Sequence, residues 1–352
     1  MRPCVVVIIM PIMFLSQIKS AFAWHQDGHM AIARIAWKQM DDAQRVYFSN
    51  LLKKHPHYEI FLIAGKPANV SEVEWAFCKA ACWSDWVRGP RDPGMTQEQS
   101  QDIKQHFDKP VWHYIDLPFI HPDDAGKFDE AAIRKQMLEP EYDKNGQPRH
   151  VLAALAYNTK IFKSTEASDA DKAVAMTWIM HLVGDLHQPL HATGLVSSAN
   201  GFIAPECDRG GNLEAIRVKE SDQRGVNLHF YWDALLFANQ PGFDGVDTLV
   251  ADLLNDANLK QEKLTELSAT TFLDWAEESL AICKSTVYMD GGKFLKFKAL
   301  PAHSRIDLND TTIPVLSEEY QKAAATTARR RMVLAGYRLA GQFKQAFPGT
   351  SN

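Results

Sequence analysis

The sequence has few cysteines, little strand-like sequence and no excess of positive charge. It contains five cysteines among 352 residues, and its formal net charge is −5. A mildly acidic chain lacks the basic surface of a protein that coats nucleic acid in general. Because the cysteines are widely scattered, they argue against a metal site built from cysteine pairs. Long apolar runs are also scarce, and the one that is present lies at the N-terminus.

This N-terminal segment has the pattern of a signal peptide. A charged start with Arg2 precedes the apolar run Val5–Leu15, and the segment closes on Ala21-Phe-Ala23. The apolar run is too short to span a bilayer, and the small residues at its end are typical of a cleavage site. We therefore expect residues 1–23 to be a signal peptide that is removed between Ala23 and Trp24. The mature chain is expected to be secreted or periplasmic, without a transmembrane anchor.

Four cysteines follow the expected cleavage site: Cys78, Cys82, Cys207 and Cys283. Export permits disulfides, so we expect two of them. Four cysteines allow three pairings, and the sequence does not choose among these. Cys78 and Cys82 lie one helical turn apart, near the limit of the geometry that a disulfide can bridge.

Helical periodicity dominates the rest of the chain and predicts a mainly α-helical fold with little β structure. The predicted helices are 31–40, 43–52, 72–87, 151–162, 170–186, 230–238, 249–254, 270–285 and 317–347. The best strand candidate is 213–218, and Arg329-Arg330-Arg331 is expected on a solvated helix face. Polar clusters spread from residue 24 to residue 233 suggest a single domain over residues 24–350, and we expect a monomer.

The densest of these clusters is the run His181-Leu-Val-Gly-Asp185-Leu-His187-Gln-Pro-Leu-His191. His181 and Asp185 are four residues apart, so on a helix their side chains share one face. Pro189 should end that helix near residue 187, so that His191 arrives from a turned segment. Imidazoles and carboxylates at this density suit a borderline-soft divalent cation such as zinc.

A second pair downstream, His229 and Asp233, repeats the four-residue spacing. Further candidates are the acid in Trp-Ser-Asp85-Trp, the histidine in Trp-His113-Tyr, His29, and the α-amine and carbonyl of a mature Trp24. The candidate metal ligands are therefore Trp24, His29, Asp85, His113, His181, Asp185, His191, His229 and Asp233. They exceed the needs of one tetrahedral zinc and would suffice for three. His187 is expected to have a hydrogen-bonding or buried role instead.

Taken together, these motifs resemble the zinc-dependent, single-strand-specific nucleases with 3′-nucleotidase activity. The resemblance rests on Trp24, His29, Trp-x-Asp85, His113-Tyr-x-Asp116, His181-x-x-x-Asp185, His187-Gln-Pro-Leu-His191, Asp208-x-Gly-Gly-Asn212 and Asn-Leu-His229-x-x-Trp-Asp233. It implies a helical fold of the phospholipase C and zinc nuclease type with three zinc ions. It assigns Asp85, His113, His181 and Asp185 to one zinc. Trp24, His29 and a bridging Asp185 would hold the second, and His191, His229 and Asp233 the third.

The resemblance also implies an activity. A hydroxide bridging two zinc ions would attack phosphorus, hydrolysing single-stranded DNA or RNA to 5′-nucleotides and removing 3′-phosphate from nucleotides. Arg88 and Asp116 match catalytic positions next to the ligands, and Tyr114 matches an aromatic that stacks on a base. From its residues alone, Tyr114 is equally compatible with core packing beside His113.

Two alternatives remain open. A zinc-dependent phospholipase C shares the fold and the N-terminal tryptophan, but that family has a longer gap before its first histidine and ends its ligand set with glutamate. Here Trp24 and His29 are five residues apart, and Asp233 closes the set. An exported zinc-binding protein without catalysis is the second alternative, although zinc storage would not need Arg88, Asp116 and Tyr114.

Overall fold

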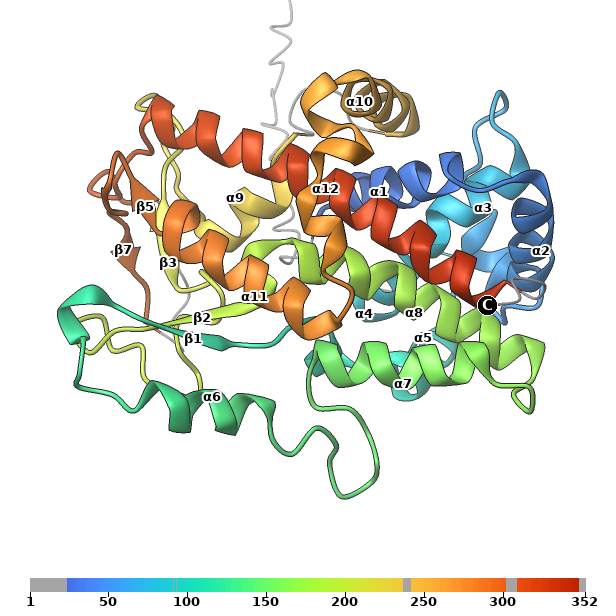
Figure 1. Cartoon of the computed structure of the whole chain (residues 1–352), viewed down its shortest axis with the longest axis horizontal. Coiled ribbons are helices and arrows are strands. Elements are labelled where there is room, and N and C mark those ends of the chain that lie inside the picture. The colour runs from blue at the N-terminus through green and yellow to red at the C-terminus, as the bar shows by residue number, and fades with distance from the viewer. Residues whose placement is uncertain (1–23, 91, 93, 237–241, 302–308, 348–352) are drawn as a thin grey trace, which may run out of the picture.

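The computed structural model describes residues 24–90, 92, 94–236, 242–301 and 309–347. The predicted signal peptide lies outside the described residues. Among these residues, helices dominate and surround a long central helix, as predicted (Figure 1). The α-helices are α1 (Gln26–Lys38), α2 (Asp42–Leu52), α3 (Glu72–Ala80), α4 (Trp83–Arg88), α5 (Gln97–Phe107), α6 (Glu130–Leu138), α7 (Val151–Lys163), α8 (Asp169–His187), α9 (Leu228–Ala234), α10 (Phe243–Asn255), α11 (Phe272–Ile282) and α12 (Glu318–Ala346).

Short helical turns of 3₁₀ or π type connect several of these elements. They are η1 (Tyr58–Leu62), η2 (Pro110–His113), η3 (Pro122–Asp124), η4 (Pro189–His191), η5 (Ala257–Leu259), η6 (Gln261–Lys263), η7 (Thr265–Ser268) and η8 (Cys283–Val287). The strands are β1 (Leu117–Ile120), β2 (Thr193–Val196), β3 (Glu214–Ile216), β4 (Val226–Asn227), β5 (Met289–Asp290), β6 (Lys293–Phe294) and β7 (Lys298–Ala299). β1 and β2 pair in parallel, β4, β3 and β7 form an antiparallel sheet, and β5 and β6 form a hairpin.

Helix α8 forms the centre of the molecule. Every residue from Ala175 to His187 is buried, so the helix is covered on all sides. It packs against α7, α12 and α1. Such a helix needs apolar residues around its whole circumference, and buried polar side chains on it must find partners. The polar exceptions on its last two turns are His181, Asp185 and His187.

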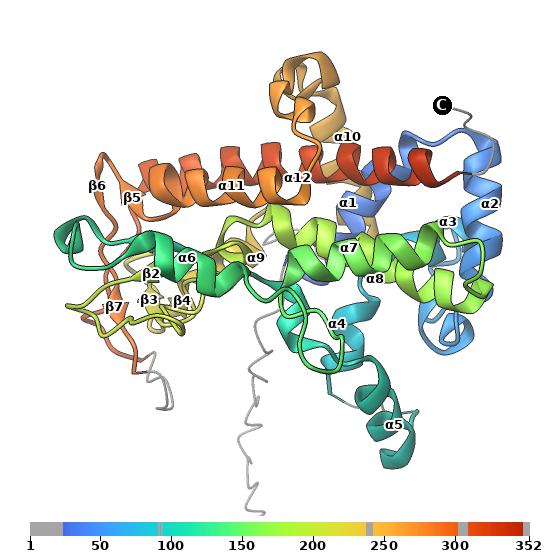
Figure 2. The same ribbon diagram turned by 60° about the horizontal axis from the view of Figure 1, so that its bottom comes forward.

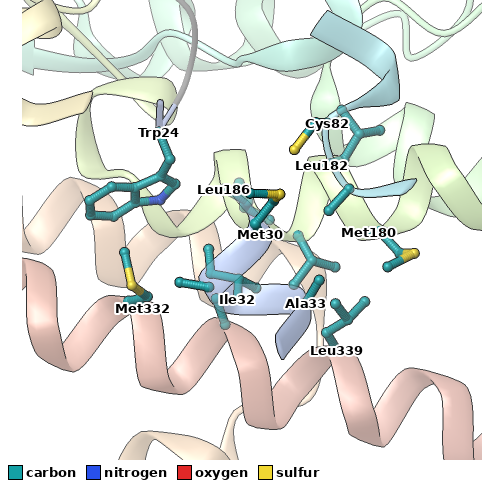
Figure 3. Close-up of a cluster of buried hydrophobic side chains, with 14 of the residues drawn as sticks. Trp24, Met30, Ile32, Ala33, Cys82, Met180, Leu182, Leu186, Met332 and Leu339 are labelled. Atoms are coloured by element: carbon teal, nitrogen blue, oxygen red, sulfur yellow. The ribbon is translucent and has the colours of Figure 1, made fainter. Parts of the chain in front are cut away.

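Two glycines let α1 approach its neighbours closely. A Cβ atom on Gly184 of α8 would lie 2.7 Å from Nδ1 of His29. A Cβ atom on Gly336 of α12 would lie 2.4 Å from the Ile35 side chain. Because both positions lack a Cβ, α1 fits between α8 and α12 and carries His29 to the face of α8. Figure 3 shows Trp24, which precedes α1, within the apolar cluster that these helices bury.

The predicted helix 72–87 is interrupted at Ala81 and Cys82. Cys82 N donates to the Lys79 carbonyl in a tight turn, which separates α3 from α4. The interruption leaves the Ala81 carbonyl to accept a bond from the His181 ring, at 2.8 Å from Nδ1. The break in the helix therefore makes the Ala81 carbonyl available to orient the ring of His181 on α8.

Helices α5 and α6 were not predicted. α5 buries only Ile103 and α6 buries none of its residues, so neither has the apolar stripe on which the prediction relied. Their start signals are present nevertheless. The Thr96 hydroxyl and the Gln99 amide form a reciprocal cap on α5, and the Asp129 carboxylate caps α6. Figure 2 shows α5 extending away from the main body.

Other boundaries shift by a few residues. The segment with His113 and Asp116 contains the end of the turn η2, and strand β1 starts only at Leu117. Helix α9 starts earlier than predicted because Asn227 caps it, and residues 237 and 238 of that prediction lie outside the described residues. Helix α10 starts before the predicted 249–254. Of the predicted strand 213–218, the structure forms 214–216.

The prediction of two disulfides is wrong, because all four described cysteines are free and buried. The Cys82 thiol lies 3.3 Å from the Gln26 carbonyl and 4.0 Å from the Cys78 carbonyl, and it donates to these oxygens instead of bonding to the Cys78 sulfur. Cys207 touches Gly194 and Cys283 bonds to Thr193, which are consecutive residues of β2. Since consecutive side chains of a strand point to opposite faces, β2 separates these two thiols.

The solvated face predicted for the arginine run 329–331 is also partly wrong. Arg329 and Arg330 are partly exposed and pair with acids on neighbouring segments. Arg331 is 2% exposed and pairs with Glu278 on α11. Consecutive helical residues differ by about 100° in direction, so one of three neighbours can face the core. In the part of the chain that the structure describes, no helix is long and apolar enough to cross a membrane.

Candidate metal centre

The predicted ligands come together from elements far apart in the sequence. His29 lies on α1, Asp85 on α4, His113 at the end of η2, His181 and Asp185 on α8, His191 at the end of η4, and His229 and Asp233 on α9. Their ligand atoms form three sets, each within 4.8 Å: His29, Asp85 and His181; His113, His181 and Asp185; and His191, His229 and Asp233. The first two sets share His181, so we call their members the five-residue group. The last set is the three-residue group.

Asp185 is the centre of the five-residue group. Its Oδ1 lies 3.3 Å from Nε2 of His29. Its Oδ2 lies 3.0 Å from Nδ1 of His113 and 3.3 Å from Nε2 of His181. The two carboxylate oxygens thus face different histidines, which is the arrangement that a carboxylate bridging two cations requires.

Burial sets the protonation of this group. It lowers the pKa of His29 to about 4 and that of His113 to about 3, so both imidazoles are neutral and able to donate an electron pair. Burial also lowers the pKa of His181, but the carboxylates of Asp185 and Asp85 overcome it and raise the value to about 9. Burial raises the pKa of Asp85, against the opposing effect of His181. A cation would stabilise the charged form of this acid.

The three-residue group is smaller and equally buried. Nε2 of His229 lies 3.5 Å from Oδ2 of Asp233, one helical turn along α9. The other oxygen of Asp233 accepts a bond from Nε2 of Gln188 at 2.7 Å. Burial lowers the pKa of His229 to about 3 and raises that of Asp233 well above its usual range. Burial also lowers the pKa of His191, so two imidazoles kept neutral face a carboxyl group whose charged form needs a counter-charge.

Backbone carbonyls orient three of the five histidines. Nδ1 of His181 lies 2.8 Å from the Ala81 carbonyl, and Nδ1 of His191 lies 2.8 Å from the His113 carbonyl. Nδ1 of His229 lies 2.7 Å from the Gly210 carbonyl. A ring whose Nδ1 bonds to a carbonyl directs its Nε2 toward the candidate ligand group, as histidines that bind metals in proteins usually do.

Buried atoms without hydrogen-bond partners are concentrated here. They include both ring nitrogens of His29, Nε2 of His113 and His191, and one carboxylate oxygen each of Asp85, Asp185 and Asp233. A buried polar atom without a partner costs about 1–3 kcal/mol, so seven of them in one place would be a large unbalanced cost. Cations held by these atoms would remove that cost, so the donor set fits a metal centre.

Trp24 lies between the two groups. Its side chain is fully buried, and its indole nitrogen donates to the carbonyl of Gly184, which precedes Asp185. The next backbone nitrogen, that of His25, donates to the Asp233 carbonyl at 3.0 Å. These two bonds fix Trp24 and His25 beside both Asp185 and Asp233.

A pocket of about 370 Å³ opens onto this centre. Its wall includes Arg88, Tyr114 and Asp116 together with the rings of His113, His191 and His229. Tyr114 is 41% exposed, so core packing does not explain it. The Arg88 guanidinium lies 3.8 Å from the Asp108 carboxylate. Burial raises the pKa of Asp116 to about 7, and the neighbouring Asp208 adds to this effect.

A loop that contributes no candidate ligand also lines the pocket, with Pro205, Glu206, Arg209 and Asn212. The buried Asp208 carboxylate holds this loop by accepting from the backbone of Leu195, Gly210 and Gly211 and from the Tyr288 hydroxyl. Gly210 has φ +60°, and a Cβ atom there would lie 2.3 Å from the Leu190 carbonyl. This is the physical reason for glycine in the motif Asp208-x-Gly-Gly-Asn212.

His187 lies outside both groups, as the sequence indicated. Its Nδ1 bonds to the Val183 carbonyl at 2.7 Å, and its Nε2 accepts from Arg338 at 2.8 Å. Three other contributors had not been predicted: Gln188, Asp208 and the Ala81 carbonyl. Gln188 and Asp208 lie within motifs quoted in the sequence analysis, where neither was given a role, and no sequence signal pointed to the Ala81 carbonyl.

Comparisons with known proteins agree with this geometry. The model of the S1/P1 Nuclease family matches residues 24–348. Endonuclease 2 of Arabidopsis thaliana is 23% identical over 354 residues, which cover 97% of each protein. Endonuclease 1 of the same plant is 23% identical, over 97% of this chain and 92% of its own length. Nuclease S1 of Aspergillus oryzae (strain ATCC 42149 / RIB 40) is 24% identical over 66% of this chain and 70% of its own length.

Proposed function

Because the chain belongs to the S1/P1 nuclease family, we propose that it is a zinc-dependent nuclease that hydrolyses single-stranded DNA and RNA to 5′-nucleotides. We also propose that it removes the 3′-phosphate from nucleotides. One observation carries the proposal: the His/Asp groups and the side chains of Arg88, Asp116 and Tyr114 meet in one pocket. A protein that only stored zinc would have no use for those three side chains at its metal centre.

Three zinc ions are proposed, held by nine residues. Asp85, His113, His181 and Asp185 would hold one; Trp24, His29 and Asp185 its neighbour; and His191, His229 and Asp233 the third. The imidazole and carboxylate donors match the preferences of zinc, and the buried unpartnered atoms give each ion its ligands. Trp24 would contribute its α-amine and carbonyl once the preceding residues are removed. Zinc would supply Lewis acidity, activating water at neutral pH and neutralising phosphate charge.

The protein side chains position the substrate. Arg88 can place its guanidinium against the phosphate and stabilise the charge that develops during in-line attack. Asp116, on the same wall, can accept a hydrogen bond from the attacking water or orient it. The exposed ring of Tyr114 offers a flat surface for a base, and stacking of this kind contributes about 1–3 kcal/mol per base. Since only an unstacked base can use such a surface, single strands are the expected substrates.

We further propose that the protein is secreted or periplasmic, that it begins at Trp24 in its mature form, and that residues 24–350 form one domain. A monomer suffices for this function, because every proposed ligand comes from one chain. Because the α-amine of Trp24 exists only after cleavage, activity would depend on removal of the signal peptide during export.

The deciding experiment compares initial rates of the mature protein on four substrates: heat-denatured DNA, duplex DNA, a 3′-nucleotide and phosphatidylcholine. We expect cleavage of denatured DNA and of the 3′-nucleotide, slow cleavage of duplex DNA, and loss of all rates after chelation with recovery on added zinc. Cleavage of the lipid alone would replace the proposal with a zinc phospholipase C. Bound zinc without hydrolysis of any of the four would identify a metal-binding protein instead.

A further inference from the structure

We propose that Arg209 binds the phosphate adjacent to the scissile one, so that the pocket favours substrates with at least two phosphates over those with one. This inference rests on the proposed nuclease function and names a subsite within it. The residues concerned lie on a loop that lines the pocket together with Arg88, and none of them is a proposed metal ligand.

The loop places the Arg209 side chain at the pocket at a conformational cost. Arg209 has φ +57°, which is unfavourable for a residue with a Cβ atom. The side-chain amide of Asn212 donates to the Arg209 carbonyl at 2.8 Å and stabilises this conformation. Strained backbone of this kind is concentrated at functional sites. In this loop it turns the arginine toward the pocket that Tyr114 and Asp116 also line.

Arg209 lines the same pocket as the residues proposed to bind substrate. Tyr114 shares this pocket with two arginines from different elements, Arg88 of α4 and Arg209 of the loop. A base stacked on Tyr114 would have a guanidinium available for the phosphate on either side.

In the free protein the partner of Arg209 is Glu206, which also lines the pocket. The guanidinium nitrogen Nη2 lies 2.8 Å from Oε2, and the two side chains are 41% and 61% exposed. An ion pair this exposed contributes little to stability and can be exchanged for another anion. A phosphate group likewise offers two oxygen acceptors to the guanidinium, and it carries a fixed negative charge. The Glu206 carboxylate, by contrast, would repel an incoming phosphate.

The size of the pocket agrees with a polynucleotide as the ligand. Its volume of about 370 Å³ is at the lower end of the range for small-molecule sites, enough for about one nucleotide unit. The neighbouring phosphate of a longer strand would then lie at the rim, where Arg209 and Glu206 are. A mononucleotide carries no phosphate at that position and would not use Arg209.

The test compares kcat/KM on a dinucleoside monophosphate, which has one phosphate, with that on the matching trinucleoside diphosphate, which has two. The variants are Arg209→Met, Arg209→Lys and Glu206→Gln, and Arg149→Met is a control on an exposed arginine away from the pocket. We expect Arg209→Met to lower the ratio of the two-phosphate to the one-phosphate rate constant about tenfold. Arg209→Lys should restore most of that ratio, Glu206→Gln should raise it, and Arg149→Met should leave it unchanged.

A second measurement is the salt dependence of KM on single-stranded DNA. Loss of one phosphate contact should reduce the slope of log KM against log salt by about 0.7 in Arg209→Met. The inference would be overturned if Arg209→Met left both the kcat/KM ratio and the salt slope unchanged. It would also be overturned if Glu206→Gln lowered the kcat/KM ratio, as Arg209→Met is expected to do. If the unmodified protein cleaves neither substrate, the nuclease proposal itself fails, which is a different result from an unchanged ratio in an active enzyme.

Discussion

Two buried polar clusters lie at the end of helix α8, and they satisfy their charges in different ways. The first is the metal centre, built from the five-residue and three-residue groups around His181, Asp185 and His191. The second, which we call the arginine cluster, consists of His187, Glu278, Arg331 and Arg338. His187 is only two residues from Asp185, yet it belongs to the second cluster because its ring points toward α12.

The arginine cluster is complete without an ion. Glu278 accepts from Arg331 at 2.6 Å and from both terminal nitrogens of Arg338 at 2.6 and 2.7 Å. Arg331 also donates to the His187 carbonyl and to the Ser279 hydroxyl. The only unpartnered buried atom in the cluster is Nε of Arg338. Such a cluster orients helices α8, α11 and α12 relative to one another.

The metal centre differs in its charges and in the number of its buried atoms that lack hydrogen-bond partners. Its described members are histidines and aspartates without a buried lysine or arginine among them, and seven of their atoms have no partner. Buried acids without a counter-charge are costly, and among the described members of the groups the raised pKa of His181 leaves its ring as the one cationic side chain for three acids. The arginine cluster balances its charges with its own side chains, whereas the donor set of the other cluster fits added cations.

The largest expected effect comes from Asp185→Asn. The amide keeps the shape but removes the negative charge that faces three histidines, so two ions lose a shared ligand. We expect the rate of hydrolysis to fall by a factor of about a thousand or more, corresponding to about 4 kcal/mol. The zinc content should fall as well. Asp169→Asn, on the exposed first turn of the same helix, is the matched control and should leave both unchanged. Full activity in Asp185→Asn would contradict the proposed bridging role.

Glu278→Gln should have the converse result. Removing this charge leaves Arg331 and Arg338 buried without a counter-ion, which costs about 3 kcal/mol of unfolding free energy. Because no metal ligand is involved, the zinc content should stay at its original value. Chemical denaturation and metal analysis of the same sample check both expectations. Glu277→Gln is the control, since its partner Arg134 is on the surface. Loss of zinc in Glu278→Gln would show that the two clusters are coupled.

A chain that keeps one extra residue before Trp24 tests the N-terminal ligand. The α-amine would then be a peptide nitrogen, which cannot bind the metal through a lone pair. We expect activity to fall roughly 10- to 100-fold, as when a metal site loses a supporting group. The comparison is between the two purified chains under saturating zinc. Equal activity of both chains would remove Trp24 from the ligand set.

The smallest expected effect is that of a reducing agent. All four described cysteines are free, and burial raises the pKa of each thiol. Neither cluster therefore depends on a disulfide. We expect the melting temperature to be the same with and without a non-chelating reductant such as a phosphine. A lower melting temperature in the presence of the reductant would show that the disulfides expected from the sequence do form.

Two pairs of candidate ligands that the structure brings together could be identified from the sequence because their spacing is local. His181 and Asp185, like His229 and Asp233, fall one helical turn apart, and the prolines and asparagines that bound their helices are visible in the sequence. The partners of these residues could not be predicted in the same way. The Ala81 carbonyl is available only because a helix breaks there, and Gln188 faces Asp233 only after α8 and α9 pack.

The prediction failed where tertiary contacts decide. Arg331 was expected in solvent because it lies in a run of charge, but Glu278 provides it with a buried partner. Helices α5 and α6 bury almost nothing, so an argument from apolar periodicity missed them. The cysteines were expected to pair because export permits it, but strand β2 separates Cys207 from Cys283. In each case the information lies in residues distant along the chain.

The most direct test of the account is the metal content of the purified mature protein, measured by elemental mass spectrometry against its protein concentration. The account predicts three zinc ions per chain, falling toward one in Asp185→Asn and staying at three in Glu278→Gln. A mature protein that cleaves single-stranded DNA with no bound metal would contradict it.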